Sequence, residues 1–398
     1  MKEYDVAIIG GGPGGYTAAI RASQLGLKAT VIEKSELGGT CLNWGCIPTK
    51  SLLHSADVLR SVQHANELGI KTGKVSFDLS KMVKASRQAA GRLNQGVGHL
   101  MKKYKIDVQK GEAVVKERGL VSVDGTDFFA DNIIIATGAR ARTLEGLEPD
   151  GKVVWHATDA MTPKKMPNKL LIIGAGAIGV EFASFYNTLG AEVTLVEVLE
   201  EILPNEDAEI AATARMSFEG LGIKVLTGAQ ISQFSVGKKF TCQINSESFE
   251  FDNVISSVGV MGNIEGIGLE GLGVETERGF ISVNGHQQTN VAGVYAIGDV
   301  AGAPCLAHKA SHEGVIAVET IAGLTPHALQ AQQIPACTYS HPQVASIGLN
   351  EAACAGRDIR IGRFPLLANG KAVAIGETEG IIKTIFDRAT GELLGAHM

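Results

Sequence analysis

The sequence has 398 residues, of which 45% are hydrophobic and 20% charged, a balance typical of a soluble globular protein with about two to four domains. A net charge of −6 provides no broad basic field, so we expect no nucleic-acid partner. No run of about 18 apolar residues predicts a membrane span, and the N-terminus leads directly into a strand, which leaves no room for a signal peptide. We therefore expect a cytoplasmic protein without a membrane partner, in a compartment where a disulfide is usually catalytic.

The first predicted element is a strand at residues 6–9 that leads into a turn of the form Gly10-x-Gly12-x-x-Gly15. A helix of small residues follows, and a second strand ends in Glu33. Glycines at these positions allow a tight turn, a close approach of a pyrophosphate and packing of the helix on its strand. The helix N-terminus favours phosphate, and Glu33 is placed to accept a hydrogen bond from a ribose hydroxyl.

A close pair of cysteines, Cys41 and Cys46, comes next. Residues five apart on a regular α-helix lie roughly 8–9 Å apart, whereas a disulfide needs Cα atoms about 4.4–6.8 Å apart. The pair can therefore close only if the backbone leaves the helix between the cysteines, and Gly39, Gly45 and Pro48 suit such a departure. We interpret the pair as a redox-active disulfide, with two buried, unlinked cysteines as the alternative. The scattered cysteines are expected to be free thiols: Cys242, Cys305, Cys337 and Cys354.

Lys50 follows Cys46 by about one helical turn. A lysine in this place can stabilise a thiolate or a negative charge on a bound cofactor, although taken alone it would more often be a solvated lysine. A buried lysine needs a carboxylate partner, and Glu181 is the candidate.

Helices are expected at residues 51–67 and 79–103, followed by short strands and a buried strand that runs into Thr137 and Gly138. A second glycine turn, Gly174-x-Gly176-x-x-Gly179, again lies between a strand and a helix. Glu197 follows Gly174 by 23 positions, the spacing that separates Glu33 from Gly10. One such motif could be only a tight turn, but the repetition with every part in place predicts two dinucleotide sites.

Asp299 follows a third strand of this kind, at residues 294–297. A carboxylate at the carboxyl end of a parallel strand can bind a ligand hydroxyl, or it can cap the following helix. We predict an α/β fold with two Rossmann-like domains, the second inserted into the first, and the start of an α+β interface domain. The predicted boundaries are 1–143 with 263–333 for the first domain, 144–262 for the insertion, and 334–398 for the interface part.

The block Gly39-Thr40-Cys41-x4-Cys46-x-Pro48, between two dinucleotide folds, resembles that of the pyridine nucleotide-disulfide oxidoreductases. Further family markers are the segments 296–299, 306–310 and 334–339. The resemblance implies FAD in the first domain, NAD in the second and a disulfide that turns over. It implies no metal site.

The resemblance also implies a role for each residue. Cys46 would be the thiolate against the flavin, Cys41 would exchange with substrate, and Lys50, paired with Glu181, would lie by the reactive flavin nitrogen. The implied FAD contacts are Gly10, Gly12, Gly15, Glu33, Thr40, Lys50, Ala113, Thr137, Gly138, Asp299 and Ala307. The implied NAD contacts are Gly174, Gly176, Ile178, Gly179, Glu197, Ile231 and Gly259.

The implied activity is oxidation of protein-bound dihydrolipoamide with NAD⁺, in the shared component of 2-oxo acid dehydrogenase complexes. The partners would be the lipoyl group of an acyltransferase or carrier protein and a second copy of the chain. The family's His–Glu base motif is not found, since His308 and His341 do not fit it, so we expect the sequence to end within the interface domain. An NADH diaphorase, a non-catalytic flavin-bearing scaffold, and a reductase for glutathione or mercuric ion stay open as alternatives.

Overall fold

The computed structural model describes residues 2–398, which pack as two compact units. Unit 1 is formed by the chain up to Pro48 together with residues 85–141 and 260–329. Unit 2 is formed by residues 49–84, 142–259 and 330–398. Each unit therefore collects three separate segments of the chain, and the division into four domain segments made from the sequence stays a prediction.

Unit 1 is built on a sheet in the order β3-β2-β1-β6-β5-β4, with β19 beside β6. The central strands pair in parallel, and the stretches 6–9 of β1 and 133–135 of β6 are apolar and buried, as expected for a sheet covered on both faces. The strands are β1 (Glu3–Ile9), β2 (Ala29–Glu33), β3 (Asp107–Lys110), β4 (Ala113–Glu117), β5 (Leu120–Val123), β6 (Thr126–Ile135) and β19 (Val294–Ala296).

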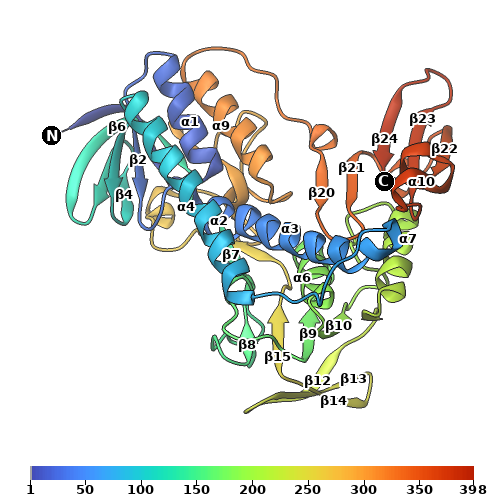
Figure 1. Cartoon of the computed structure of the whole chain (residues 1–398). Coiled ribbons are helices and arrows are strands. Elements are labelled where there is room, and N and C mark those ends of the chain that lie inside the picture. The colour runs from blue at the N-terminus through green and yellow to red at the C-terminus, as the bar shows by residue number, and fades with distance from the viewer. Residues whose placement is uncertain (1) are drawn as a thin grey trace. The chain divides into compact units, whose positions relative to one another are not determined.

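Two helices of unit 1, α1 (Pro13–Gln24) and α9 (Ala307–Ile321), lie side by side (Figure 1). Glycines allow this approach, because a Cβ at Gly314 would lie 2.7 Å from the carbonyl oxygen of Gly14. The middle of α9 is thereby held against the helix that follows the first glycine turn. The remaining elements are α2 (Gly39–Trp44), β7 (Ala139–Ala141), β16 (Val260–Gly262), α8 (Leu269–Leu272), β17 (Thr276–Glu277), β18 (Phe280–Ile281) and η2 (Gly298–Ala301).

Unit 2 repeats the parallel arrangement in a sheet of order β11-β10-β9-β15-β8. An antiparallel sheet of β12, β13 and β14 follows, and helices α6 and α7 flank the parallel strands in the sequence. The elements are β8 (Val154–Trp155), α5 (Ala157–Ala160), β9 (Lys169–Ile173), α6 (Ala177–Thr188), β10 (Glu192–Val196), α7 (Ala208–Gly220), β11 (Lys224–Leu226), β12 (Ile231–Val236), β13 (Phe240–Ile244), β14 (Glu247–Phe251) and β15 (Asn253–Ser256).

The last segment of unit 2 is an antiparallel sheet in the order β20-β21-β24-β23-β22. Its strands are β20 (Ala336–Thr338), β21 (Val344–Gly348), β22 (Ile359–Pro365), β23 (Ile381–Asp387) and β24 (Leu393–His397), with the short helix α10 (Gly370–Ile375). The buried Lys383 of β23 joins this sheet to α7, because its Nζ lies 2.8 Å from Asp207 Oδ1 and 3.1 Å from Glu209 Oε2. Two long helices, α3 (Cys46–Gln63) and α4 (Leu79–Lys103), contribute residues to both units.

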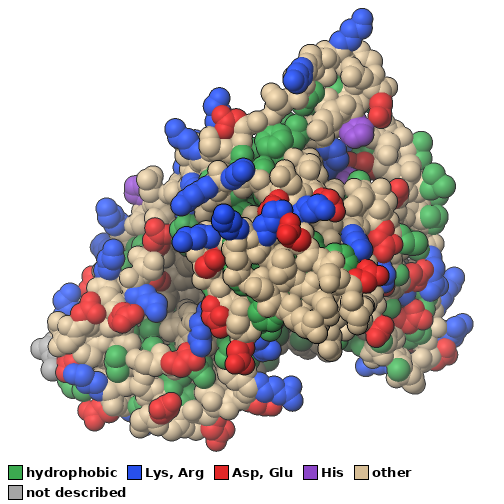
Figure 2. All heavy atoms as spheres, turned by 90° about the horizontal axis from the view of Figure 1, so that it is seen from below, with side chains coloured by type: hydrophobic (Ala, Val, Ile, Leu, Met, Phe, Trp, Pro, Cys, Tyr) green, Lys and Arg blue, Asp and Glu red, His purple; other side chains and the backbone are tan. Residues whose placement is uncertain are grey.

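Positive and negative side chains are interspersed on the face drawn in Figure 2. Across residues 2–398, none of the helices is long and apolar enough to cross a membrane.

Candidate functional site

Cys41 and Cys46 form a disulfide with a Cα–Cα distance of 4.7 Å. The two cysteines lie on different helices, because α2 ends at Trp44 and α3 begins at Cys46. Gly45 separates the helices, and a Cβ there would lie only 3.1 Å from the carbonyl oxygen of Thr40. The predicted departure from the helix between the cysteines is therefore confirmed. The four other cysteines are free, as predicted: Cys242, Cys305, Cys337 and Cys354.

The first glycine turn allows no side chain at its two ends. Gly10 has φ +111°, and a Cβ there would lie 2.2 Å from the carbonyl oxygen of Ala136. A Cβ at Gly15 would lie 1.9 Å from the carbonyl oxygen of Gly10. Glu33 closes the turn, since its Oε2 accepts a hydrogen bond of 2.8 Å from the backbone N–H of Gly11.

The second glycine turn has the same construction in unit 2. A Cβ at Gly174 would lie 2.5 Å from the carbonyl oxygen of Ser257, and one at Gly179 would lie 1.9 Å from that of Gly174. Glu197 Oε2 accepts a hydrogen bond of 2.8 Å from the backbone N–H of Ala175. The two turns thus share their backbone contacts as well as their sequence spacing.

Both turns fit a dinucleotide. The helices that follow them, α1 and α6, have glycine N-caps, and no side chain of residues 2–398 caps either helix. Their first N–H groups are therefore available for phosphate oxygens. A Cβ at Gly176 would meet no heavy atom within 4 Å, so the protein leaves this middle position open. The carboxylate oxygens of Glu33 and Glu197 retain lone pairs for a ribose hydroxyl beside their backbone contacts.

The first turn packs directly against the cysteine segment. The backbone N–H of Gly38 donates a 2.8 Å hydrogen bond to the carbonyl oxygen of Gly11. Gly39 has φ +56°, and a Cβ there would lie 2.8 Å from the Cα of Gly12. A ligand on the first turn therefore lies close to the start of α2, which carries Cys41.

Thr137 and Gly138 follow β6 and are held by Asn263. The Thr137 hydroxyl donates a 2.7 Å hydrogen bond to the Asn263 carbonyl, and the Asn263 N–H donates one of 2.9 Å to the Gly138 carbonyl. The side-chain amide of Asn263 donates to the Thr137 carbonyl at 2.9 Å. The sequence predicted Thr137 and Gly138 but not the asparagine that fixes them, because the partner lies 126 positions away.

Asp299 lies in η2, ahead of the start of α9 at Ala307. Burial raises the pKa of Asp299, and the positive charge of Lys309 acts against this shift. Lys309 Nζ lies 3.0 Å from Glu313 Oε1, and both side chains are 6% exposed. Glu313 also accepts a 2.7 Å hydrogen bond from the N–H of Gly298.

Lys309 and Glu313 were missed as a pair from the sequence, although their spacing of four on a helix was the available signal. His308, rejected as a catalytic base, is exposed, whereas Glu313 is buried and paired with Lys309.

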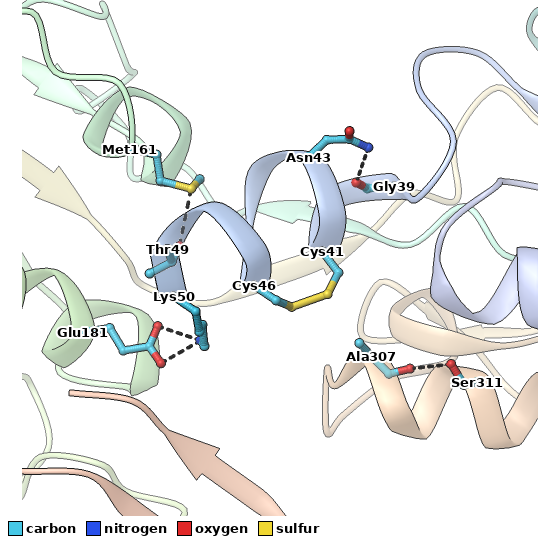
Figure 3. The surroundings of a disulfide bond; sticks show 10 residues. All are labelled: Gly39, Cys41, Asn43, Cys46, Thr49, Lys50, Met161, Glu181, Ala307 and Ser311. Carbon is cyan, nitrogen blue, oxygen red and sulfur yellow. Dashed lines mark hydrogen bonds and ion pairs between the residues drawn. A yellow bond between two sulfur atoms is a disulfide. The ribbon is translucent and has the colours of Figure 1, made fainter. Parts of the chain in front are cut away.

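Lys50 lies one turn after Cys46 on α3, and its Nζ lies 2.8 Å from Glu181 Oε1 and 3.0 Å from Oε2 (Figure 3). The pairing predicted from the sequence is therefore present, with Glu181 buried on α6. The backbone N–H of Tyr339 donates a 2.9 Å hydrogen bond to Glu181 Oε1, and Lys50 Nζ lies 4.8 Å from the Tyr339 ring centre. Tyr339 is a further partner that the sequence did not indicate.

The remaining predicted contacts divide between the units. Ala113 is buried at the start of β4, and Thr40 is exposed on α2, both in unit 1. In unit 2, Ile178 is 46% exposed on α6, and Ile231 is half-buried at the start of β12. Gly259, with φ +96°, accepts a 2.9 Å hydrogen bond from the N–H of Arg142.

Unit 1 therefore contains every predicted FAD residue except Lys50, and unit 2 contains every predicted NAD residue.

His341, the second rejected base, lies half-buried in unit 2, where burial lowers its pKa. Its backbone N–H donates a 2.9 Å hydrogen bond to the hydroxyl of Ser184 on α6.

The two dinucleotide turns, with a redox disulfide beside the first, define a flavoprotein disulfide oxidoreductase. Residues 4–314 match the pyridine nucleotide-disulphide oxidoreductase family, and residues 334–398 match the dimerisation domain of the same family. The chain belongs to this family, and its cofactors are FAD and NAD(H).

Among its relatives, the dihydrolipoyl dehydrogenase of Rhizobium etli is 51% identical over 100% of this chain and 89% of its own length. The enzyme of the same name from Bacillus subtilis is 43% identical over 100% of this chain and 88% of its own length. The crystal structure of LpdA from Mycobacterium tuberculosis superposes with a TM-score of 0.92 at 25% identity, over 100% of this chain and 89% of that one.

Proposed function

We propose that this protein oxidises protein-bound dihydrolipoamide with NAD⁺, as the flavoprotein shared by 2-oxo acid dehydrogenase complexes. The observation that carries the proposal is the Cys41–Cys46 disulfide at a helix break, in a chain 51% identical to a dihydrolipoyl dehydrogenase. The dithiol substrate would transfer two electrons and two protons to the Cys41–Cys46 disulfide and leave as a cyclic disulfide. Cys41 and Cys46 would then be two thiols. FAD, when bound, supplies a two-electron relay between these thiols and nicotinamide.

The proposal assigns a role to each part of the chain. Cys41 exchanges with the substrate, and Cys46 is the thiolate that faces the flavin. Lys50, one turn after Cys46 and ion-paired with Glu181, stabilises negative charge at the reactive flavin nitrogen. The FAD set of residues in unit 1 would hold that cofactor, with Glu33 on its ribose and Asp299 and Ala307 towards the ribityl chain and ring.

The proposed NAD site is the second glycine turn. The uncapped start of α6 would hold the pyrophosphate, and Glu197 would accept a hydrogen bond from the ribose. Ile178, Ile231 and Gly259 would line the rest of this site. Because a carboxylate repels a 2′-phosphate, the proposal specifies NAD rather than NADP.

We also propose a homodimer that receives the lipoyl arm of an acyltransferase or carrier protein in the cytoplasm. The match of residues 334–398 to the family's dimerisation domain supports the dimer. Sedimentation of the purified protein at a mass near 41.7 kDa, that of one chain, would contradict it.

The activity is tested with Cys46→Ser in the protein loaded with FAD. We expect dihydrolipoamide oxidation by NAD⁺ to fall by about 10³-fold or more, since the nucleophilic pair is lost. NADH oxidation by an artificial dye should persist in the same sample, because this transfer does not need the disulfide. A wild-type protein that binds FAD and oxidises NADH with a dye, but does not oxidise dihydrolipoamide, would contradict the proposed substrate.

A further inference from the structure

The short helix α2 carries a buried asparagine between the two cysteines. Asn43 is only 4% exposed, and its side chain lies on the opposite side of α2 from the disulfide (Figure 3). A buried amide needs hydrogen-bond partners, and its contacts therefore show what holds this segment.

The side chain of Asn43 folds back to the beginning of α2. Its Nδ2 donates hydrogen bonds of 2.9 Å to the Leu37 carbonyl and 3.0 Å to the Gly39 carbonyl. A six-residue helix is too short to be stable alone, so these two bonds contribute to its shape.

Helix α4 holds the same segment from outside. Asn94 Nδ2 donates a 2.6 Å hydrogen bond to the Leu37 carbonyl and one of 3.3 Å to Asn43 Oδ1. The Arg87 guanidinium donates to the backbone carbonyl of Asn43 and lies 3.8 Å from the centre of the Trp44 ring. Arg87 and Asn94 are seven residues, about two turns, apart, so they lie on one side of α4.

The contact from Arg87 falls where α2 ends. The last carbonyls of a helix have no partner within the helix, and Arg87 supplies one just before the Gly45 break. Its stacking on Trp44 adds a cation–π contact to the same helix end. The residues between Cys41 and Cys46 are thus fixed by groups that do not depend on the disulfide.

We infer that Arg87 and Asn94 of α4, acting through Asn43, are positioning residues that keep Cys41 and Cys46 in closing geometry when their disulfide is reduced. The inference rests on the proposed function, in which this disulfide opens and closes in every turnover. Opening breaks the S–S bond and places two electrons and two protons on the sulfurs. The remaining covalent connection is the chain through Gly45, and the contacts from α4 limit how far the two thiols separate.

The test is the equilibrium of the FAD-bound protein with dithiothreitol. Dithiothreitol gives two electrons and two protons to Cys41–Cys46 and becomes a cyclic disulfide. The dithiol-to-disulfide ratio of the protein, multiplied by the oxidised-to-reduced ratio of dithiothreitol, gives the equilibrium constant of this exchange. Thiols are trapped with a maleimide and located by mass spectrometry, and the flavin absorbance is recorded in the same samples. Removing the contacts from Arg87 or Asn94 lowers the effective concentration of one thiol at the other. The equilibrium should then shift towards the reduced form, in which Cys41 and Cys46 are thiols.

We expect Arg87→Met and Asn94→Leu each to shift the constant about 2- to 10-fold towards the dithiol, the effect of one hydrogen bond. Arg92→Met, an exposed arginine on the same helix, is the matched control and should leave the constant unchanged. Arg87→Lys provides the same measurement if Arg87→Met loses FAD, since it keeps the charge and loses the planar contact with Trp44.

A contact that is only structural would lower the melting temperature without changing this constant. The inference is overturned if the variants bind FAD and their constants equal that of Arg92→Met. The experiment contains no lipoamide, so failure of the proposed substrate would be seen separately, as absence of dihydrolipoamide oxidation by the wild type.

Discussion

The two glycine turns make nearly the same backbone contacts, yet their surroundings differ. In both, the first glycine lies against the neighbouring strand, the third lies against the first, and a glutamate accepts from the N–H of the residue after the first glycine. The middle glycines differ. Gly12 lies beside Gly39 of the cysteine segment, whereas Gly176 faces open space.

Under the proposed function, this difference would let one motif serve two roles. The first turn is packed into the segment that carries the disulfide, so its ligand is part of the redox centre and should stay bound. The second turn is accessible at the position where a pyrophosphate would approach, as a nucleotide that enters and leaves requires. In the proposed function, both turns bind a dinucleotide, and the packing around the glycines would separate a resident cofactor from an exchanging one.

The largest expected effect comes from the third glycine of each turn. Gly15→Ala should abolish FAD binding, because the added Cβ would overlap a carbonyl oxygen. Gly179→Ala creates the same overlap in the second turn, so this variant should still bind FAD and be yellow, but its affinity for NADH should fall by at least about 10- to 100-fold. The flavin absorbance of the purified variants measures bound FAD, and the change of this absorbance on titration with NADH measures the affinity for NADH. Gly91→Ala in unit 1 and Gly220→Ala in unit 2, where a Cβ meets nothing within 4 Å, are the controls. Equal loss of FAD in Gly15→Ala and Gly179→Ala would contradict the division of roles.

The next effect concerns the choice of nucleotide. We expect NADH to be preferred over NADPH by at least about tenfold, since roughly 1.4 kcal/mol of repulsion between Glu197 and a 2′-phosphate suffices. Glu197→Gln retains an oxygen for the Ala175 N–H and removes the charge, so the preference should narrow several-fold. Rates of flavin reduction by the two nucleotides give the ratio. An unchanged ratio in Glu197→Gln would show that another group selects the nucleotide.

Gly176→Ala tests whether a pyrophosphate lies against the second turn at its open position. The added methyl group meets no protein atom, so the melting temperature should stay that of the wild type. NADH should nevertheless bind about three- to tenfold more weakly if the pyrophosphate lies against this backbone. Unchanged NADH affinity would place the nucleotide elsewhere.

The smallest effect is on stability at low pH and distinguishes the two units by their buried carboxylates. Burial alone would raise the pKa of Asp207 in unit 2, but hydrogen bonds from Lys383 and from the Glu351 N–H lower it below the usual value. In unit 1, by contrast, burial raises the pKa of Glu313. A carboxyl group with a lowered pKa stabilises the fold above its unfolded pKa, and this contribution is lost as the pH falls through the folded pKa.

The melting temperature should therefore fall as the pH drops from about 5 to below 4, by roughly 1 °C for each kcal/mol lost in a chain of this length. Asp207→Asn should be less stable at neutral pH and show a flatter dependence in this range. Glu313→Gln is the comparison variant from unit 1, and it should not flatten the fall, because a carboxyl group with a raised pKa favours the fold as the pH drops. An Asp207→Asn variant with the slope of the wild type would contradict the role of this ion pair.

The sequence predicted those parts of the site that depend on local geometry. Spacing identified both glycine turns and their glutamates. The reach of a disulfide across five residues predicted a break between Cys41 and Cys46, which the structure places at Gly45. The pairing of Lys50 with Glu181 was expected on the premise of a buried lysine, whereas the structure buries the carboxylate, 7% exposed, and leaves the lysine side chain 35% exposed.

Contacts between distant segments could not be predicted in the same way. Asn263, Arg87 and Asn94 lie in no motif recognised in the sequence, and each acts through a partner 44 or more positions away. Tyr339 ends one of the family markers, but its contact with Glu181, 158 positions away, was not indicated by that marker. Their identity is specified by packing in three dimensions, for which a single sequence provides no periodic signal.

The exchange of electrons between NADH, the flavin and the Cys41–Cys46 disulfide is tested by anaerobic reduction of the purified, FAD-bound protein with NADH. Thiols are counted before and after the reduction. We expect the flavin absorbance to change and two additional thiols per chain to appear, one at Cys41 and one at Cys46. Flavin reduction with no change at Cys41 and Cys46, or new thiols at other cysteines, would contradict this expectation.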